Sequence, residues 1–448
     1  MRKNFVPQKD INLVVDGLNK YFQRMIQTHT FNSLEMKNLM EPIFNESGYR
    51  RSSINDGRVL NILLTHIFVG VGDFIIMSPA VREIRRIYPE AHITFVVSQN
   101  VVNLVECCPY IDEVVLDHHH CDFRNFLSIY QWNAELSKKL LLRRYDMAFP
   151  LSGMPSELLL AYMSGTQKIF SFKPGSAQHF LEPFGSKLYE PFLTEIPVVS
   201  PHFNENSRFS RNMILVDSIV RYPIANREGE VWLSANDRGF ARDLLSAYIS
   251  NDYKIYVICM GGTAPRKQWS PKNYARLTQM IAEQESKVKF IVMGGGQLDN
   301  WSADIFKQSV DEKFFNEYII DMTNKCTYRQ SGAILEFAEM YIGNDTGTMH
   351  LAVVVKTPVL TPNCFPVDLH KSIGGGVPKG YYPYHVPSVT VQPKHALPEC
   401  QDSKDGWGCC IAERPHCITQ ITVETMFDGY NKLKERIADN NIEPLFIS

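Results

Sequence analysis

The chain has 448 residues and a formal net charge of −2, with 44% hydrophobic and 21% charged residues. This composition is ordinary for a globular protein of two or three domains, and the near-zero charge gives no reason to expect a nucleic-acid partner. No apolar run approaches the roughly 18 residues of a membrane span, and no apolar signal segment follows the N-terminal basic residues. We therefore expect a cytoplasmic protein.

Residues 1–58 are predicted to form a helical N-terminal extension. One amphipathic helix is indicated by apolar residues at helical spacing, namely Leu13, Val14, Leu18, Phe22 and Ile26. A second helix is expected from Ser33 to Phe44, followed by a polar linker. The arm is expected to pack on the next domain or on a partner subunit, so self-association through it is one hypothesis.

Residues 59–228 are predicted to form a first α/β domain. The expected strands cover Val59 to Phe68, His92 to Ser98, Glu113 to Asp117 and Tyr145 to Phe149. The expected helices between them cover Phe74 to Ile87 and Phe123 to Leu142. Strands that alternate with helices indicate a doubly wound parallel sheet, whose ligands lie at the carboxyl ends of the strands.

Asp73 follows the first of these strands in the stretch Gly70-Val71-Gly72-Asp73. The two glycines suggest a dinucleotide fingerprint, but Ile75 occupies the place of the third glycine and the next strand ends without an acidic residue. A dehydrogenase is therefore the weaker interpretation. A carboxylate at this turn fits a general base, and the alternative is a carboxylate that merely stabilises the start of a helix.

Residues 229–448 are predicted to form a second α/β domain with the same alternation. A buried strand from Lys254 to Met260 leads into a long polar loop, and Ser270 with Pro271 marks the next helix start. Lys267 lies in that glycine-rich loop, where a lysine can neutralise a pyrophosphate. The alternative for Lys267 is a solvated loop lysine. Further strands are expected at Val288 to Met293, Tyr318 to Asp321 and Pro358 to Thr361, and further helices at Gln297 to Gln308, Thr327 to Ala338 and Thr422 to Ile437.

The most informative stretch runs from Tyr341 to His350. A short buried strand ends at Gly343 and Asn344, and a tight turn leads into a mostly apolar helix from Thr348 to Val355. Backbone N–H groups at such a helix start form an anion site suited to phosphate. Asp345 can accept hydrogen bonds from sugar hydroxyls, and phosphate oxygens can accept them from Thr346, Thr348 and His350. The alternative is an N-capped helix with His350 as a core histidine.

In this order and spacing, these signals resemble glycosyltransferase family 9, the lipopolysaccharide heptosyltransferases and their relatives. The motifs that carry the resemblance are Gly72-Asp73 ahead of Tyr88-Pro89, Lys267-x-Trp269-Ser270-Pro271, and Asp345-Thr346-Gly347-Thr348-Met349-His350. The resemblance covers about residues 59–365. It implies an α/β protein of GT-B fold, with two Rossmann-like doubly wound domains facing across a cleft.

The resemblance also implies an inverting transfer of a sugar, often heptose from ADP-heptose, to a glycan or protein acceptor. It makes Asp73 the catalytic base and Lys267 the catalytic contact to the donor phosphates. The donor-binding residues would be Gly72, Thr263, Lys267, Asp345, Thr346, Gly347, Thr348 and His350. The chain has no Asp-x-Asp pair, so no catalytic metal is expected, and helix N–H groups with Lys267 would meet the leaving-group charge.

Four of the ten cysteines crowd into the segment 398–417, namely Cys400, Cys409, Cys410 and Cys417. Thiolates this dense can hold one structural Zn or Fe ion, and the alternative is a set of ordinary thiols. The N-terminal arm and this segment depart from the family pattern. A non-catalytic nucleotide-sugar-binding or assembly protein on the same fold is the second hypothesis for function, and peripheral contact with the inner membrane is a further one.

Overall fold

The computed structural model describes residues 6–28, 32–47, 60–67, 70–117, 136–151, 155–171, 191–192, 194, 216, 226, 228–262, 264–368, 383–398 and 414–448. These residues divide into two compact units. The first holds the described residues up to Asn226, except Gly70–Ser78, whose contacts place them in the second unit with the chain from Glu228 onward.

The first unit begins with two helices, α1 (Gln8–Thr28) and α2 (Ser33–Glu46), which confirms the helices predicted for the arm. Asn32 caps α2, because its side chain accepts hydrogen bonds from the N–H groups of Leu34 and Glu35. The apolar faces of both helices join the core of the first unit, where Phe44 meets Tyr162 edge to face at 5.7 Å between ring centroids. Val14, Leu18 and Phe22 of the predicted stripe are therefore buried by their own unit, whereas Leu13 is 39% exposed.

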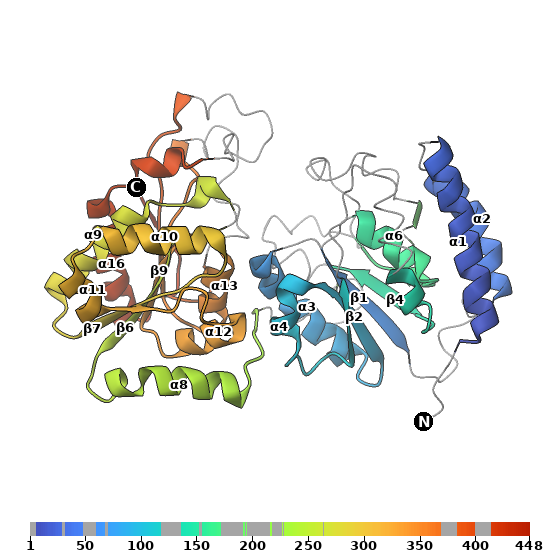
Figure 1. The fold of residues 1–448 in the computed structure, drawn as a ribbon, viewed down its shortest axis with the longest axis horizontal. Helices are drawn as coiled ribbons and strands as arrows, with labels where there is room; N and C mark the ends of the chain where they lie inside the picture. The colour runs from blue at the N-terminus through green and yellow to red at the C-terminus, as the bar shows by residue number, and fades with distance from the viewer. Residues whose placement is uncertain are drawn as a thin grey trace. The chain divides into compact units, whose positions relative to one another are not determined.

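The sheet of the first unit is entirely parallel, in the order β3-β2-β1-β4-β5 (Figure 1). Its strands are β1 (Asn61–His66), β2 (His92–Ser98), β3 (Glu113–Asp117), β4 (Met147–Pro150) and β5 (Lys168–Ile169). Its helices include α4 (Val102–Val105), α6 (Pro155–Met163) and the part of α3 (Val71–Ile87) that follows Ser78, with a short 3-10 turn η1 (Gln99–Val101). The predicted strands and the first predicted helix are confirmed. Most of the helix expected from Phe123 lies outside the described residues.

The sheet of the second unit repeats this order and extends it, as β12-β11-β10-β9-β6-β7-β8, again with parallel pairing. Its strands are β6 (Lys254–Cys259), β7 (Val288–Val292), β8 (Ile319–Asp321), β9 (Met340–Gly343), β10 (Val359–Pro362), β11 (Ser388–Val391) and β12 (Leu445–Ile447). Its helices are α8 (Ala235–Ile249), α9 (Pro271–Gln284), α10 (Gln297–Gln308), α11 (Glu312–Tyr318), α12 (Tyr328–Glu336), α13 (Gly347–Val354) and α16 (Val423–Ala438). Its described part also has two 3-10 turns, η4 (Pro265–Lys267) and η5 (Cys417–Gln420).

Helix starts in the second unit follow the sequence signals closely. Thr327 and Gln330 form a reciprocal capping box at α12, and Thr422 caps α16. Ser270 occupies the N-cap of α9 as predicted, with Pro271 in the first helical position, but among the described contacts its side chain makes no capping hydrogen bond. The proline alone pre-organises that helix start.

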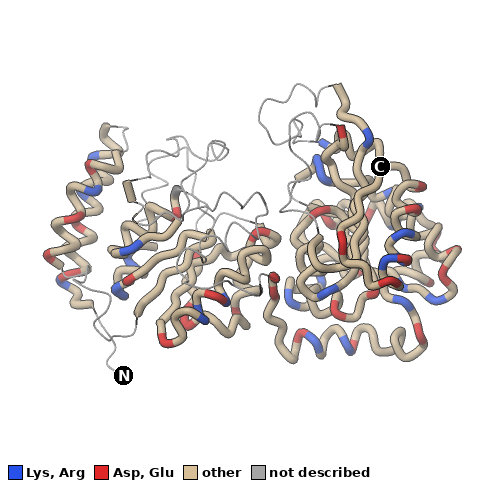
Figure 2. Tube along the Cα trace, turned by 180° about the vertical axis from the view of Figure 1, so that it is seen from behind, with Lys and Arg blue, Asp and Glu red and all other residues tan. Residues whose placement is uncertain are grey.

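Charged residues of both signs are mixed along the described chain, as Figure 2 shows. The described helices include none that is long and apolar enough to span a bilayer. None of the described cysteines is in a disulfide.

A buried carboxylate, Glu285, ties α16 to the start of β6. Its oxygens accept hydrogen bonds from Lys254 at 2.6 Å, from Tyr430 at 2.6 Å and from Lys434. Burial by itself raises the pKa of Glu285, but these hydrogen bonds outweigh it and bring the pKa down to about 2. The ionised form therefore stabilises the fold.

We expect Glu285→Gln to lower the free energy of unfolding by about 2 kcal/mol at pH 7, because it leaves two lysines facing a neutral amide. The folded pKa lies below the ordinary value, so this stabilisation is present above about pH 4.5 and is lost as the pH falls toward 2. Urea unfolding at several pH values measures the difference. The control is Glu283→Gln in the last turn of α9 (Pro271–Gln284), two residues before Glu285; its carboxylate is 70% exposed and 3.7 Å from Arg276. An equal loss in both variants would contradict the assignment.

Candidate active site

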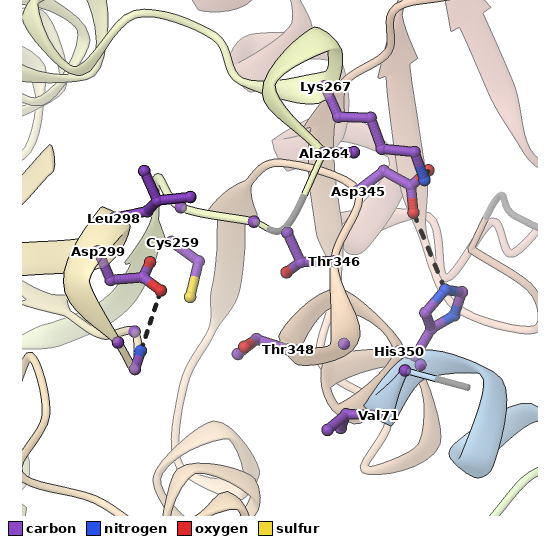
Figure 3. Close-up of a pocket in the computed structure, with 18 of the residues that line it drawn as sticks. Val71, Cys259, Ala264, Lys267, Leu298, Asp299, Asp345, Thr346, Thr348 and His350 are labelled. Carbon is purple, nitrogen blue, oxygen red and sulfur yellow. Dashed lines mark hydrogen bonds and ion pairs between the residues drawn. The ribbon is translucent and has the colours of Figure 1, made fainter. Parts of the chain in front are cut away.

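The site lies where the strand order of the second sheet reverses, between β6 and β9. These strands pair in parallel, with Cys259 opposite Gly343 at their carboxyl ends. The loop after β6 and the turn after β9 therefore leave the sheet side by side, at the position where open α/β sheets bind ligands. A cavity of about 440 Å³ opens there, lined by both loops, by the start of α10 and by Gly70, Val71, Gly72 and Asp73 (Figure 3).

Asn344 fastens these two loops together. It is fully buried, and its amide donates to the carbonyl oxygens of Met260 and, at 3.2 Å, Gly261. Its side-chain oxygen accepts from the N–H of Trp269 at 3.1 Å and from the hydroxyl of Tyr274 at 2.8 Å. Every hydrogen-bonding position of this amide is used, so Asn344 sets the distance between the two loops.

Trp269 anchors the loop that carries Lys267. Its ring is 1% exposed and donates from Nε1 to the carbonyl oxygen of Ile421 at 2.8 Å. Gln268 closes the loop by donating to the carbonyl oxygen of Gly262 at 2.8 Å. With the chain fixed on both sides of it, Lys267 reaches the cavity from the short turn η4.

Lys267, Asp345 and His350 form a polar cluster at one side of the cavity (Figure 3). Lys267 Nζ lies 2.7 Å from Asp345 Oδ2, and His350 Nε2 lies 3.9 Å from Asp345 Oδ1. The side chains of Asp345 and His350 are 4% and 5% exposed, whereas that of Lys267 is 21% exposed. The lysine is thus the member of the cluster most open to a ligand, and a buried carboxylate orients it.

The N-terminus of α13 supplies backbone donors beside this cluster. Thr346 is the N-cap in extended backbone, and in the described structure its side chain makes no capping hydrogen bond to the first turn. Gly347 and Thr348 line the cavity, so the positive end of the helix dipole borders it. Gly347 packs closely against Val71, since a Cβ there would lie 2.9 Å from Cβ of Val71.

The opposite wall contains residues that the sequence analysis did not select, namely Cys259, residues 294–296, Leu298, Asp299 and Tyr328. In Figure 3, Thr346 and Thr348 are drawn between this wall and the Lys267 cluster. Leu298 is 46% exposed and Tyr328 is 38% exposed, so the wall offers apolar surface.

The same wall contains titratable side chains with shifted pKa values. Burial raises the pKa of Asp299, although hydrogen bonds from the backbone N–H groups of Gly295 and Gly261 lower it in part. Burial also raises the pKa of the Cys259 thiol to about 12, which keeps this thiol neutral.

Most of the predicted donor residues come together in this one cavity. Its lining includes Gly72, Asp73, Lys267, Asp345, Thr346, Gly347, Thr348 and His350. Gly72 lies so close to His350 that a Cβ would be 2.6 Å from its ring carbon Cδ2. Thr263 lies outside the described residues, so its predicted role stays a prediction.

The cysteine segment is described in part. Cys417 is buried, with its Sγ 3.4 Å from Nδ1 of His416, while Cys400, Cys409 and Cys410 lie outside the described residues. Within the described ranges, His, Cys, Asp and Glu side chains form no group of three or more that could hold a metal ion.

Comparisons with solved structures show the same fold in glycosyltransferases. A glycosyl transferase of family 9 from Veillonella parvula has a TM-score of 0.62 at 15% identity, covering 84% of this chain and 97% of its own. Escherichia coli ADP-heptose lps heptosyltransferase II has a TM-score of 0.59 at 13% identity, covering 85% and 100%. Escherichia coli heptosyltransferase WaaC, solved with ADP-2-deoxy-2-fluoro heptose, has a TM-score of 0.55 at 16% identity, covering 85% and 100%. A search of curated protein sequences gives no match.

These two parallel doubly wound sheets define a GT-B fold, which confirms the predicted fold class. The class is that of glycosyltransferases that use a nucleotide sugar. The chain belongs to glycosyltransferase family 9 (heptosyltransferase), whose family model matches residues 133–361, just over half of the sequence. Asp73 lies before the matched residues, so its role needs its own evidence.

Proposed function

We propose that this glycosyltransferase moves a heptose from ADP-heptose to a hydroxyl group of a glycan or protein acceptor, with inversion at the anomeric carbon. The observation that carries the proposal is the Lys267–Asp345 pair, 2.7 Å apart beside the N-terminus of α13 in a cavity of about 440 Å³. A cation and a helix N-terminus that border one cavity suit a diphosphate. The neighbouring apolar wall at Leu298 and Tyr328 suits a nucleobase.

In this proposal the donor phosphates lie between Lys267 and the first turn of α13. Donor binding draws Lys267 Nζ from Asp345 toward a phosphate oxygen, and the Asp345 carboxylate remains within reach of His350. Thr346 and Thr348 supply hydroxyl groups at the same helix start. Charge-assisted hydrogen bonds of this kind are roughly twice as strong as neutral ones.

Asp73 is proposed as the general base. Its carboxylate takes the proton of the acceptor hydroxyl as that oxygen attacks the anomeric carbon of the donor. The bond from the anomeric carbon to the diphosphate oxygen breaks in the same displacement, and the electron pair leaves with the diphosphate. Lys267 and the N–H groups of α13 stabilise that developing charge. One displacement inverts the anomeric centre.

The test is transfer by the purified full chain. With ADP-heptose and a panel of glycan and protein acceptors, we expect acceptor-dependent release of ADP and a glycosylated product with the opposite anomeric configuration. UDP-glucose and GDP-mannose are the comparison donors. Binding of ADP-heptose without release of ADP on any acceptor would favour the non-catalytic alternative. Turnover with UDP-glucose but not with ADP-heptose would show that ADP-heptose is not the donor.

The cysteine segment is proposed to hold one structural Zn or Fe ion through Cys400, Cys417 and one or both of Cys409 and Cys410, apart from the transfer site. An ordered loop rich in glycine and proline needs compensation for its lost entropy, and metal–thiolate bonds supply it. Elemental analysis of protein purified without added metal should find about one equivalent. Less than about a tenth of an equivalent, with all four thiols titrating in the native protein, would contradict this. Transfer activity is expected to survive treatment with a chelator, because the chain has no Asp-x-Asp pair to hold a catalytic metal.

A further inference from the structure

Residues 294–296, between β7 and α10, form a wall of the cavity from three successive glycines. Gly296 has a φ of 105°, and a Cβ on Gly294 would lie 2.8 Å from Cβ of Asp299. Glycine loses more conformational freedom on ordering than any other residue. If no other residues held these glycines in place, the ligand would have to order them on binding, and the entropy cost of that ordering would lower its affinity.

Asn324, in the loop after β8, makes contacts to both ends of this segment. Its backbone N–H donates to the carbonyl oxygen of Gly294 at 2.9 Å, and its side-chain oxygen accepts from the N–H of Gly296 at 2.6 Å. Its side-chain NH₂ donates to Oδ1 of Asn300 on α10 at 2.5 Å. Asn324 therefore fastens the glycine segment and the start of α10 to the neighbouring strand.

The backbone of Asn324 is in the left-handed region, with a φ of 56°. L-residues with side chains avoid this region, although Asn tolerates it better than most. Such conformations persist where surrounding contacts over-determine them, and they cluster at ligand sites. Asn440 has a similar φ of 49° at the end of α16, outside the described lining of the cavity, and offers a matched comparison.

We infer that Asn324 is a positioning residue that holds the glycine wall in its binding shape before the donor arrives. It acts through residues 294–296, without touching the donor. This inference rests on the proposed function, which places the nucleotide in this cavity. Its consequence is selective: donor affinity depends on Asn324, whereas the chemical step at saturating donor does not.

The test is Asn324→Gly, which can keep the positive φ while removing both side-chain hydrogen bonds. We expect its dissociation constant for a nucleoside diphosphate to rise about tenfold, with an unchanged melting temperature and an unchanged kcat at saturating donor. The probe is whichever of ADP, UDP and GDP the wild-type protein binds most tightly in calorimetry. Backbone amides of residues 294–296 should also exchange faster with solvent in the ligand-free variant. Asn440→Gly should change neither the dissociation constant for the diphosphate nor the amide exchange of residues 294–296.

Wild-type affinity in Asn324→Gly, or wild-type amide exchange in the glycine segment, would overturn the inference. If that variant does not fold, Asn300→Ala removes one of the hydrogen bonds and should weaken binding about threefold. If the wild-type protein binds none of the three diphosphates, the proposed function fails. Amide exchange then still decides whether Asn324 holds the loop.

Discussion

Asp73→Asn is expected to lower kcat by about 10² or more while leaving donor affinity nearly intact. The amide keeps the shape of the side chain at the start of α3 but cannot accept the proton of the acceptor hydroxyl. Steady-state kinetics with varied donor and acceptor measures kcat, and calorimetry with ADP-heptose measures affinity. Because Asp73 lines the cavity but precedes the stretch matched to the family, this variant is the direct evidence for its role.

The control is Glu90→Gln, an exposed carboxylate just beyond the other end of α3. It should behave like the wild-type protein in both measurements. Turnover close to wild type in Asp73→Asn would remove the base assignment. A large loss of donor affinity in Asp73→Asn would instead make Asp73 a binding residue.

Lys267→Ala is expected to weaken binding of the nucleotide sugar by about 1–3 kcal/mol, because it removes a charge-assisted contact to the diphosphate. It also leaves the buried Asp345 without the ammonium that lies 2.7 Å away, so some loss of stability should accompany the loss of affinity. Calorimetry on protein that is shown by circular dichroism to be folded separates the two effects. Asp345→Ala should also weaken binding, by a similar amount, since Lys267 then loses the carboxylate that orients it.

Lys272→Ala is the matched control, because Lys272 is an exposed lysine in the first turn of α9, close to Lys267 in the sequence. It should bind the donor like the wild-type protein. Unchanged affinity in both Lys267→Ala and Asp345→Ala would place the phosphates elsewhere.

The fold class could be predicted because the buried parallel strands are continuous apolar runs and the helices between them carry capping signals. Thr327 and Gln330 show this well, since their three-residue spacing is a local signal that the structure realises as a capping box. The sequence did not indicate α4, α6 and β5 in the first unit, or α8, α11, β11 and β12 in the second. Strands β11 and β12 are only four and three residues long, too short for a periodic pattern, and they are stabilised by pairing with distant segments.

The candidate site was predicted where one local stretch carries its chemistry, as from Asp345 to His350. The pairing of Lys267 with Asp345 joins residues that are 78 positions apart, so the sequence alone indicated each separately. Asn344 was assigned only to the end of a strand, yet its side chain joins both loops. Asp299 follows a strand and a glycine run, the same signature that singled out Asp345, and that signal could have revealed it.

The most direct test of the proposed donor site is a crystal structure of this protein with ADP. We expect the diphosphate to contact Lys267 Nζ and the backbone N–H groups at the start of α13, with the base against Leu298 and Tyr328. ADP bound at another place, with the Lys267–Asp345 pair intact and this cavity empty, would contradict it.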